Sequence, residues 1–313
     1  MKTNGKPRKW ISEAIDALDP ERDYAEIMRL SVTYRSNDTF MDLIYSITFP
    51  NFVVPNRGAL AVLRGGKGKV FRHGERRMDD TARHILIWSE FGPKHEYTRQ
   101  SVESLNRLHE YWSKKYPGSF GHNEDYIYTL CYEATLFHRL MVRVGLRGLS
   151  DKEKLASWKF YFELSKFFRN AETGGSLAGF PADFAGCLGF VEQYEACKRP
   201  PNAYASAIDE TLVRAFAKRH LPAVLRPFGR ALVLSLLPEG TVRGLNLKAP
   251  NFIVRKFCRS AFAMYLLIGL KVLPDPVRSH PEVIRDRNGE TVEQYVRAVT
   301  GGIKTQPGIP VEA

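Results

Sequence analysis

A histidine lies within one of the clearest helical patterns of the chain. Apolar residues recur around it at steps of three and four: Val102, Leu105, His109, Trp112 and Tyr116. This spacing predicts an α-helix over residues 98–116 with His109 on its inward face. A buried imidazole needs a partner for at least one ring nitrogen. A backbone carbonyl, a carboxylate or an iron ion would each supply that partner.

An arginine on the preceding predicted helix, residues 75–91, raises the same question. Arg77 and Thr81 are four residues apart and therefore share a face of that helix. A buried guanidinium is costly without an anionic partner. A structural carboxylate such as Asp125 or Glu153 would serve. A haem propionate would also suit the planar, forked group.

Other combinations of chemical groups are weaker. His138 lies on the apolar stripe of the next predicted helix, where a structural role is more common than a ligand role. The acidic pair Asp79-Asp80 followed by His84 lacks the second aspartate pair of a DDxxD metal motif, so these acids are expected to favour the helix N-terminus. No serine or cysteine nucleophile lies in a recognisable elbow or loop, so hydrolase chemistry has no support.

Composition predicts a soluble, cytoplasmic protein. Of the 313 residues, 44% are hydrophobic and 12% aromatic, which allows a sizeable, well-filled core. No apolar run is long enough to span a bilayer, and no apolar stretch of a secretory signal follows the basic N-terminus. Four cysteines lie far apart without metal-ligand spacing and are expected to be reduced thiols: Cys131, Cys187, Cys197 and Cys258.

Positive charge is concentrated towards the C-terminal part of the chain. The net charge is +12, and residues 198–287 contain sixteen Lys or Arg against six Asp or Glu. Between Glu239 and Asp275 there is no acid, while six basic residues alternate with large apolar ones. Such a mixture suits peripheral contact with an anionic membrane. A solvated basic face over a buried helix explains it equally well. No zinc-finger, RNP or KH signature accompanies the charge, so no nucleic-acid partner is expected.

The sequence predicts an all-α fold, with a single helical bundle-like domain and an irregular C-terminal tail. Residues 1–74 contain N-terminal helices and a Gly-rich connection from 50 to 74, interpreted as a functional loop or a hairpin. Its glycines do not match a phosphate-binding loop. Residues 75–275 form the helical domain and residues 276–313 the tail. A capping box is expected where Ser150 and Glu153 begin a helix.

Four segments, taken in order, resemble a known enzyme family. They are Arg77-Met-Asp-Asp-Thr81, Asn106-Arg-Leu-His109, Asn123-Glu-Asp-Tyr-Ile-Tyr-Thr-Leu130 and Gly145-Leu-Arg-Gly-Leu-Ser-Asp-Lys-Glu-Lys-Leu-Ala156. Together they resemble the oxygenase family of the fungal ER-bound mpaB protein and the bacterial latex clearing protein. The resemblance covers residues 75–170, about a third of the chain.

The resemblance implies an all-helical fold that holds haem b and cleaves carbon–carbon double bonds of isoprenoid chains with O₂. By this likeness His109 is the iron ligand, and Arg77 and Thr81 are cofactor-binding residues. Two departures are visible. Asp80 replaces a lysine that can occupy the distal iron position in latex clearing protein. Residues 59–63 contain no counterpart of the acidic base that serves in rubber cleavage.

Two functions from different classes follow. The first is a haem-dependent, oxygenase-like enzyme that acts on an apolar isoprenoid or lipid substrate, with peripheral membrane contact and no nucleic-acid partner. The second is a non-catalytic helical protein that binds lipid or a protein partner without haem. Trp88, Trp112 and Tyr116 are candidates for lining a pocket in the first case.

Overall fold

The computed structural model describes residues 5–64, 67–199 and 205–301. Within these residues the regular structure is helical, and the strand-like pairing consists of an isolated bridge between Arg169 and Ser176. The predicted all-α fold is therefore confirmed. In chain order the helices are α1 (Trp10–Ala17), α2 (Tyr24–Val32), α3 (Asp38–Phe52), α4 (Asn56–Leu63), α5 (Lys69–Arg72), α6 (Gly74–Phe91), α7 (Glu96–Lys115), α8 (Asn123–Arg143), α9 (Asp151–Ser165), α10 (Phe184–Ala196), α11 (Ala205–His220), α12 (Arg226–Leu236), α13 (Glu239–Gly244), α14 (Phe252–Leu267), α15 (His280–Asn288) and α16 (Val292–Thr300).

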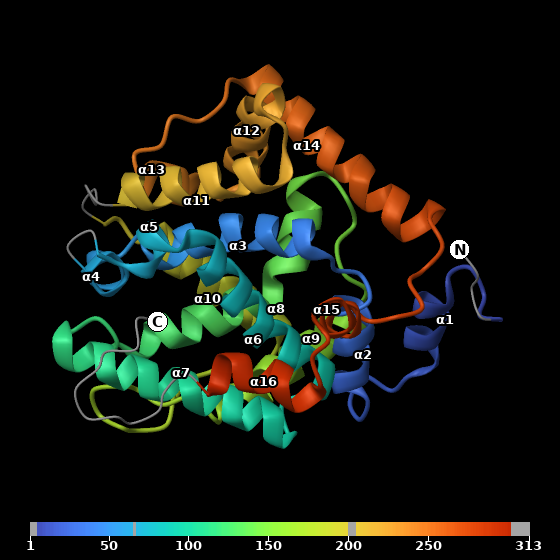
Figure 1. Cartoon of the computed structure of the whole chain (residues 1–313), viewed down its shortest axis with the longest axis horizontal. Coiled ribbons are helices and arrows are strands. Elements are labelled where there is room, and N and C mark those ends of the chain that lie inside the picture. Colours follow the sequence, from blue (N-terminus) through green and yellow to red (C-terminus); the bar gives the residue numbers. More distant parts are fainter. Residues whose placement is uncertain (1–4, 65–66, 200–204, 302–313) are drawn as a thin grey trace.

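The two ends of the described chain pack onto the same core. In Figure 1, α15 and α16 lie beside α6 and α7, while α1 and α2 lie on the neighbouring side. Ile11 of α1 and Tyr295 of α16 are both fully buried, and both belong to one apolar cluster that also contains Phe160 of α9. Segments from both ends of the chain are thus joined by one hydrophobic interior.

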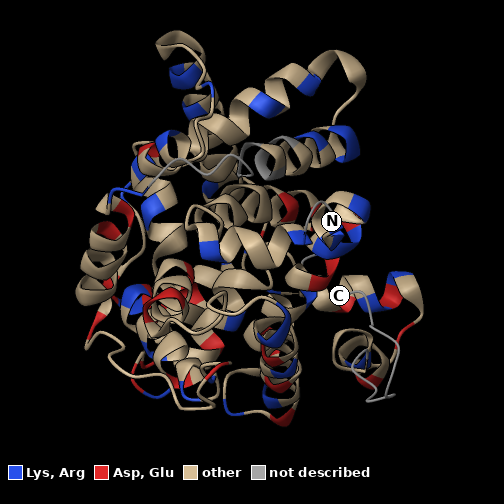
Figure 2. Ribbon diagram, turned by 90° about the vertical axis from the view of Figure 1, so that its left-hand side faces the viewer, with Lys and Arg blue, Asp and Glu red and all other residues tan. Residues whose placement is uncertain are grey.

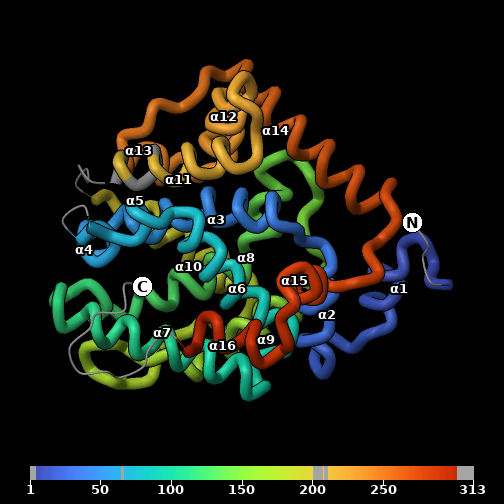
Figure 3. Tube along the Cα trace, viewed as in Figure 1, coloured from blue at the N-terminus to red at the C-terminus, as the bar shows by residue number. Residues whose placement is uncertain are grey.

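A second apolar cluster lies under the upper layer of the molecule. It joins α3 and α8 to α10, α11, α12 and α14. The tube in Figure 3 shows α11 to α14 stacked above α3, with α14 running down the outer edge. Helix α14 packs on α12 through Cys258 and Phe262, both of which are buried. The other side of α14 faces outward.

The connection over residues 50–74 is largely helical, which corrects the predicted loop or hairpin. Helix α3 continues through Pro50, although proline has no N–H to donate to the Ser46 carbonyl one turn earlier. Helix α4 then buries Ala59 and Leu63 against Met78, so burial favours helix where propensity alone does not. Gly68 lies directly before α5. A Cβ atom at this position would overlap the Val62 carbonyl oxygen, so only glycine fits there.

The segment after Pro276 is also ordered up to residue 301, contrary to the predicted irregular tail. Two capping boxes begin its helices: Ser279 with Glu282 for α15, and Thr291 with Gln294 for α16. Each box satisfies two orphan backbone N–H groups. The burial of Tyr295 then holds α16 in place. The remaining part of the predicted tail, residues 302–313, lies outside the described residues.

Among the described residues, no helix has the length and apolar character needed to cross a bilayer.

The four cysteines are free thiols: Cys131, Cys187 and Cys258 are buried, and Cys197 is exposed. Helix α14 is followed by a π-helical turn, Ile268–Val272. The six-residue helix α13 precedes it and was not predicted.

Candidate functional site

The candidate site lies between two packed helices, α6 and α7. On α6, Arg77, Thr81 and His84 follow one another at steps of four and three, so they share one face. On α7, Ser101 contacts His84 of α6, and His109 lies two turns further along the helix. Burial, then the charge of Arg77 and the imidazole of His84, lowers the pKa of His109. We call Arg77, His84 and His109 the α6–α7 cluster.

His109 has an aromatic wall and an unused nitrogen. Its ring stacks on Phe120 with centroids 4.5 Å apart and planes inclined by 14°, and the ring of Tyr126 lies 5.9 Å away, edge-on. The Nδ1 atom is buried and has no hydrogen-bond partner within the described chain. Burial, followed by the charge of Arg77, lowers the pKa of His109 to about 4. The imidazole is therefore neutral at neutral pH and keeps a lone pair for a ligand.

His84, which the sequence offered only beside Asp79-Asp80 as a metal motif, is instead joined to α7 through Ser101. Its Nδ1 lies 2.6 Å from the Ser101 hydroxyl oxygen, which also accepts a hydrogen bond from the Trp88 indole at 2.8 Å. Which of the two groups donates in the contact between His84 and Ser101 depends on the His84 tautomer. Burial lowers the pKa of His84 to about 4. The seven-residue spacing from Arg77 was the available signal.

The guanidinium of Arg77 has no carboxylate partner among the described residues. Its Nε donates to the Tyr45 hydroxyl at 3.0 Å, and its guanidinium carbon lies 4.8 Å from the ring centroid of Phe49. No ion pair within residues 5–64, 67–199 and 205–301 includes this half-buried side chain. The acids expected as structural partners are occupied: Asp125 pairs with Arg57 at 2.7 Å, and Glu153 with Arg35 at 3.1 Å.

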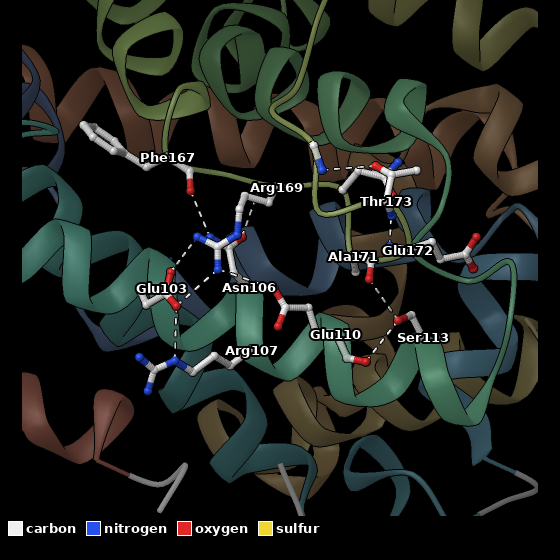
Figure 4. Close-up of polar contacts among 12 residues, drawn as sticks. Glu103, Asn106, Arg107, Glu110, Ser113, Phe167, Arg169, Ala171, Glu172 and Thr173 are labelled. Carbon is white, nitrogen blue, oxygen red and sulfur yellow. Dashed lines mark hydrogen bonds and ion pairs between the residues drawn. The ribbon is translucent and has the colours of Figure 1, made fainter. Parts of the chain in front are cut away.

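A strap formed by residues 166–176 fixes α7 and the aromatic wall. Figure 4 shows Asn106 reaching this strap: its Nδ2 donates to the Phe167 carbonyl at 2.9 Å, and its Oδ1 accepts from the Arg169 N–H at 3.2 Å. Farther along, the Ala171 N–H donates to the Phe120 carbonyl and the Tyr126 hydroxyl. Asn106 of the Asn106-Arg-Leu-His109 segment thus sets the rotation of α7, which determines where His109 points.

His138 is held by the turn between α8 and α9. Its Nδ1 accepts the Leu149 N–H at 3.3 Å, and its ring meets Phe184 edge-on at 5.4 Å. Gly148 has φ +84°, and a Cβ atom there would lie 2.5 Å from His138 Nδ1. The predicted capping box of Ser150 and Glu153 is present at the start of α9. This part of the family-like sequence therefore has a structural role.

Of the three aromatic residues predicted to line a pocket, Trp88 belongs to the core, whereas Trp112 and Tyr116 do not. Trp88 is buried, contacts Phe168 edge-on at 5.9 Å and belongs to the main apolar cluster. The indole Nε1 of Trp112 is buried and has no hydrogen-bond partner among the described residues, and the guanidinium of Arg64 lies 3.4 Å from its ring centroid. Tyr116 follows one turn later, 6.0 Å from Trp112. Trp112 and Tyr116 remain candidates for the wall.

The acidic pair near the cluster is engaged in ion pairs. Asp79 accepts from Arg219 at 2.7 Å, and Asp80 pairs with Lys69 of α5. A group of three His, Cys, Asp or Glu side chains arranged for a metal ion is absent from the described residues. Haem iron needs a single protein nitrogen together with the porphyrin, so this finding does not bear on the α6–α7 cluster.

Near the start of α3, a histidine of α11 and a histidine of α15 each contact both a hydroxyl and a carboxylate. His220 lies 3.1 Å from the Thr39 hydroxyl and 2.6 Å from Asp42, and His280 contacts Ser36 and Asp38 in the same manner. The sequence shows no nucleophile in a recognisable elbow or loop, and these four partners lie far apart along the chain. In the structure these contacts fasten α11 and α15 to α3.

Two hollows lie away from the α6–α7 cluster. One, of about 500 Å³, runs along the outer side of α7, where Glu103 already pairs with Arg107 and Arg169, as Figure 4 shows. The other, of about 410 Å³, lies among α8, α10 and α13. Its Glu195 is neutralised by Arg139 at 2.6 Å. Neither hollow is lined by a member of the cluster.

The cluster matches the chemistry of a haem b site in its donor set. It offers a neutral imidazole and an aromatic wall. Among the described residues, the imidazole Nδ1 has no hydrogen-bond partner and the guanidinium no carboxylate partner. A haem needs each of these: an axial nitrogen, a partner for a propionate and apolar surroundings. A scan against models of protein families finds no match for this sequence, and a search among curated proteins also finds none.

Proposed function

We propose that this chain is a haem-dependent, oxygenase-like enzyme that acts on an apolar isoprenoid or lipid substrate. His109 would supply a nitrogen ligand to iron, and Arg77, with Thr81 one turn later on α6, would bind a propionate. The observation that carries the proposal is the buried Nδ1 of His109, which has no hydrogen-bond partner within the described chain. An unsatisfied buried polar atom costs about 1–3 kcal/mol, so it calls for a function.

When bound, haem would supply the iron centre at which O₂ is activated. The chain itself prepares the surroundings. A His109 pKa of about 4 keeps the imidazole neutral over the physiological range, as ligation requires. The aromatic walls of Phe120 and Tyr126 exclude water from one side of the imidazole and suit an apolar substrate.

The resemblance over residues 75–170 supports the same assignment, while the two departures limit the chemistry. Asp80 is paired with Lys69, and α4 contributes Ala59 and Leu63 to an apolar cluster at the place where the family has an acidic base. We therefore do not extend the proposal to rubber cleavage through that base. The proposed substrate class remains an apolar isoprenoid or lipid.

An absorption spectrum after expression with a haem precursor tests the proposal. We expect the full-length protein to purify with a Soret band, His109→Ala to lose it, and His138→Ala to retain it. His138 is the matched control because it is also a helical histidine, but its Nδ1 already accepts the Leu149 N–H. A colourless protein, or a His109→Ala variant with an unchanged spectrum, would overturn the assignment.

Haem titration tests the role of Arg77 separately. Replacing Arg77 by Met should weaken haem binding about tenfold, the effect of losing one charge-assisted pair of about 1.4 kcal/mol. Arg76→Met is the control, because Arg76 is exposed on the next position of the same helix. Equal haem affinity in the two variants would contradict a propionate contact at Arg77.

The second candidate is a lipid- or partner-binding helical protein without haem. The observation that favours it is the outward apolar face of α14, which does not depend on the α6–α7 cluster. A protein that stays colourless after haem-supplemented expression but binds lipid would support this candidate. The two functions are therefore separated by the spectrum.

A further inference from the structure

Helix α14 is apolar on both of its faces. One face packs inward through Cys258 and Phe262, and Arg259 donates to the Ser235 carbonyl at 2.9 Å. Large side chains on the opposite face lie at steps that keep one stripe of the helix together: Ile253 (76% exposed), Phe257 (63%), Met264 (58%) and Ile268 (39%). We call these four residues the α14 outer stripe. A helix that is apolar all round is normally covered on all sides.

Neighbouring exposed residues extend this stripe. Phe252 is 67% exposed at the start of α14, and Val272 and Leu273 are each more than half exposed after its end. Val224, 85% exposed, precedes α12, whose Phe228 meets Phe257 at 6.1 Å. The apolar surface therefore runs from one end of α14 to the other and onto the beginning of α12. It is a surface rather than a set of scattered side chains.

The charged residues of α14 and its flanking segments are basic. Residues 240–274 contain no acid, and the upper helices formed by α12 and α14 show blue but no red in Figure 2. Lys248, Lys256 and Lys271 are exposed and take part in no ion pair within the described residues. Arg255 makes a long contact of 3.6 Å to Glu239. These cations are free to meet phosphate or carboxylate groups outside the protein.

We propose that the α14 outer stripe and its lysines dock this protein onto an anionic lipid bilayer. Large apolar side chains flanked by lysines match the acyl boundary and the charged headgroups of such a surface. A polynucleotide would match the lysines but would leave Ile253 and Met264 in water. The helix is not long or apolar enough to span the bilayer, so it lies in the interface.

Vesicle sedimentation of the full-length protein tests this docking. We expect binding to phosphatidylcholine vesicles that contain about 30% phosphatidylserine, and weak binding to phosphatidylcholine alone. Raising the salt from about 0.1 M to about 1 M should release the protein, because the screening length falls to about 3 Å. Equal recovery on the two kinds of vesicle at low salt would overturn the proposal.

Variants separate the apolar and the charged contributions. Changing Ile253, Phe257 and Met264 to Ser should weaken binding about 100-fold or more. The matched control changes three other exposed apolar residues to Ser: Leu60, Val142 and Val283. Lys256→Gln and Lys271→Gln should each weaken binding about fivefold. Lys94→Gln and Lys114→Gln, exposed elsewhere, should leave it unchanged.

A second copy of the chain is the competing occupant of the stripe, and light scattering distinguishes it. If the protein is a dimer that the triple Ser variant converts to a monomer, and vesicles bind neither form, the stripe is a self-association surface and the proposal is wrong. Docking is also independent of haem. A protein that lacks a Soret band but binds anionic vesicles would refute the proposed enzyme and leave the docking surface intact.

Discussion

Acid should destabilise this protein through the two buried imidazoles of the α6–α7 cluster. Burial lowers the pKa of His84 and of His109 to about 4, whereas an unfolded histidine has a pKa of about 6.5. Between these values the unfolded chain binds more protons than the folded one. Stability is therefore lost as the pH falls from about 6.5 to about 4, and it is fully present above that window.

The size of the effect follows from the two pKa values. Between about pH 7 and about pH 5, a shift from 6.5 to 4 removes about 2 kcal/mol for one histidine. The buried His84 should show this in full, and the half-buried His109 a little less. Together they amount to about 3–4 kcal/mol, a large fraction of the stability of an ordinary domain.

Urea unfolding at the two pH values, followed by circular dichroism without added haem, measures this loss. His84→Gln and His109→Gln should each reduce the difference between the two pH values by about 2 kcal/mol or slightly less, because glutamine does not titrate. His73→Gln serves as the control, since His73 is exposed. The reasoning fails if both cluster variants lose as much stability as the parent, or if NMR finds either imidazole titrating near 6.5.

Two further predictions concern the elements that hold the cluster. Asn106→Ala should lower the free energy of unfolding by about 2–3 kcal/mol in urea titrations, because it leaves a carbonyl and an N–H of the strap without a partner. Arg107→Ala on the same helix is the control and should lower it by under about 0.5 kcal/mol. Gly148→Ala should cost about 1–3 kcal/mol more than Gly145→Ala: both have positive φ, but a methyl group meets His138 at position 148 and open space at position 145. Equal midpoints within either pair would contradict the contacts described.

The sequence determined those features that depend on neighbours along the chain. Apolar spacing located α6 and α7 to within a residue or two, and the capping box of Ser150 and Glu153 was predicted from its two residue types. These are local effects, because a helix places residues three and four apart on one face. The inward position of His109 followed from the same periodicity.

The helical character of residues 50–74 and 276–301 depended on tertiary contacts. Prolines, glycines and charges in these segments argue against regular structure, and propensity is a weak guide when a segment buries its own apolar face. Met78 covers Ala59 and Leu63, and the main core covers Tyr295. No local pattern contains those partners.

The partners of the candidate residues were likewise decided by the fold. Asp125 and Glu153 were possible acids for Arg77, but the fold gave them to Arg57 and Arg35 and left Arg77 with Tyr45. His109 and His138 were alike as helical histidines on apolar stripes. Tertiary contacts distinguish them. A turn brings the Leu149 N–H to His138, whereas the buried Nδ1 of His109 has no partner among the described residues. Helix periodicity fixes the direction of a side chain but not which groups lie next to it in the fold.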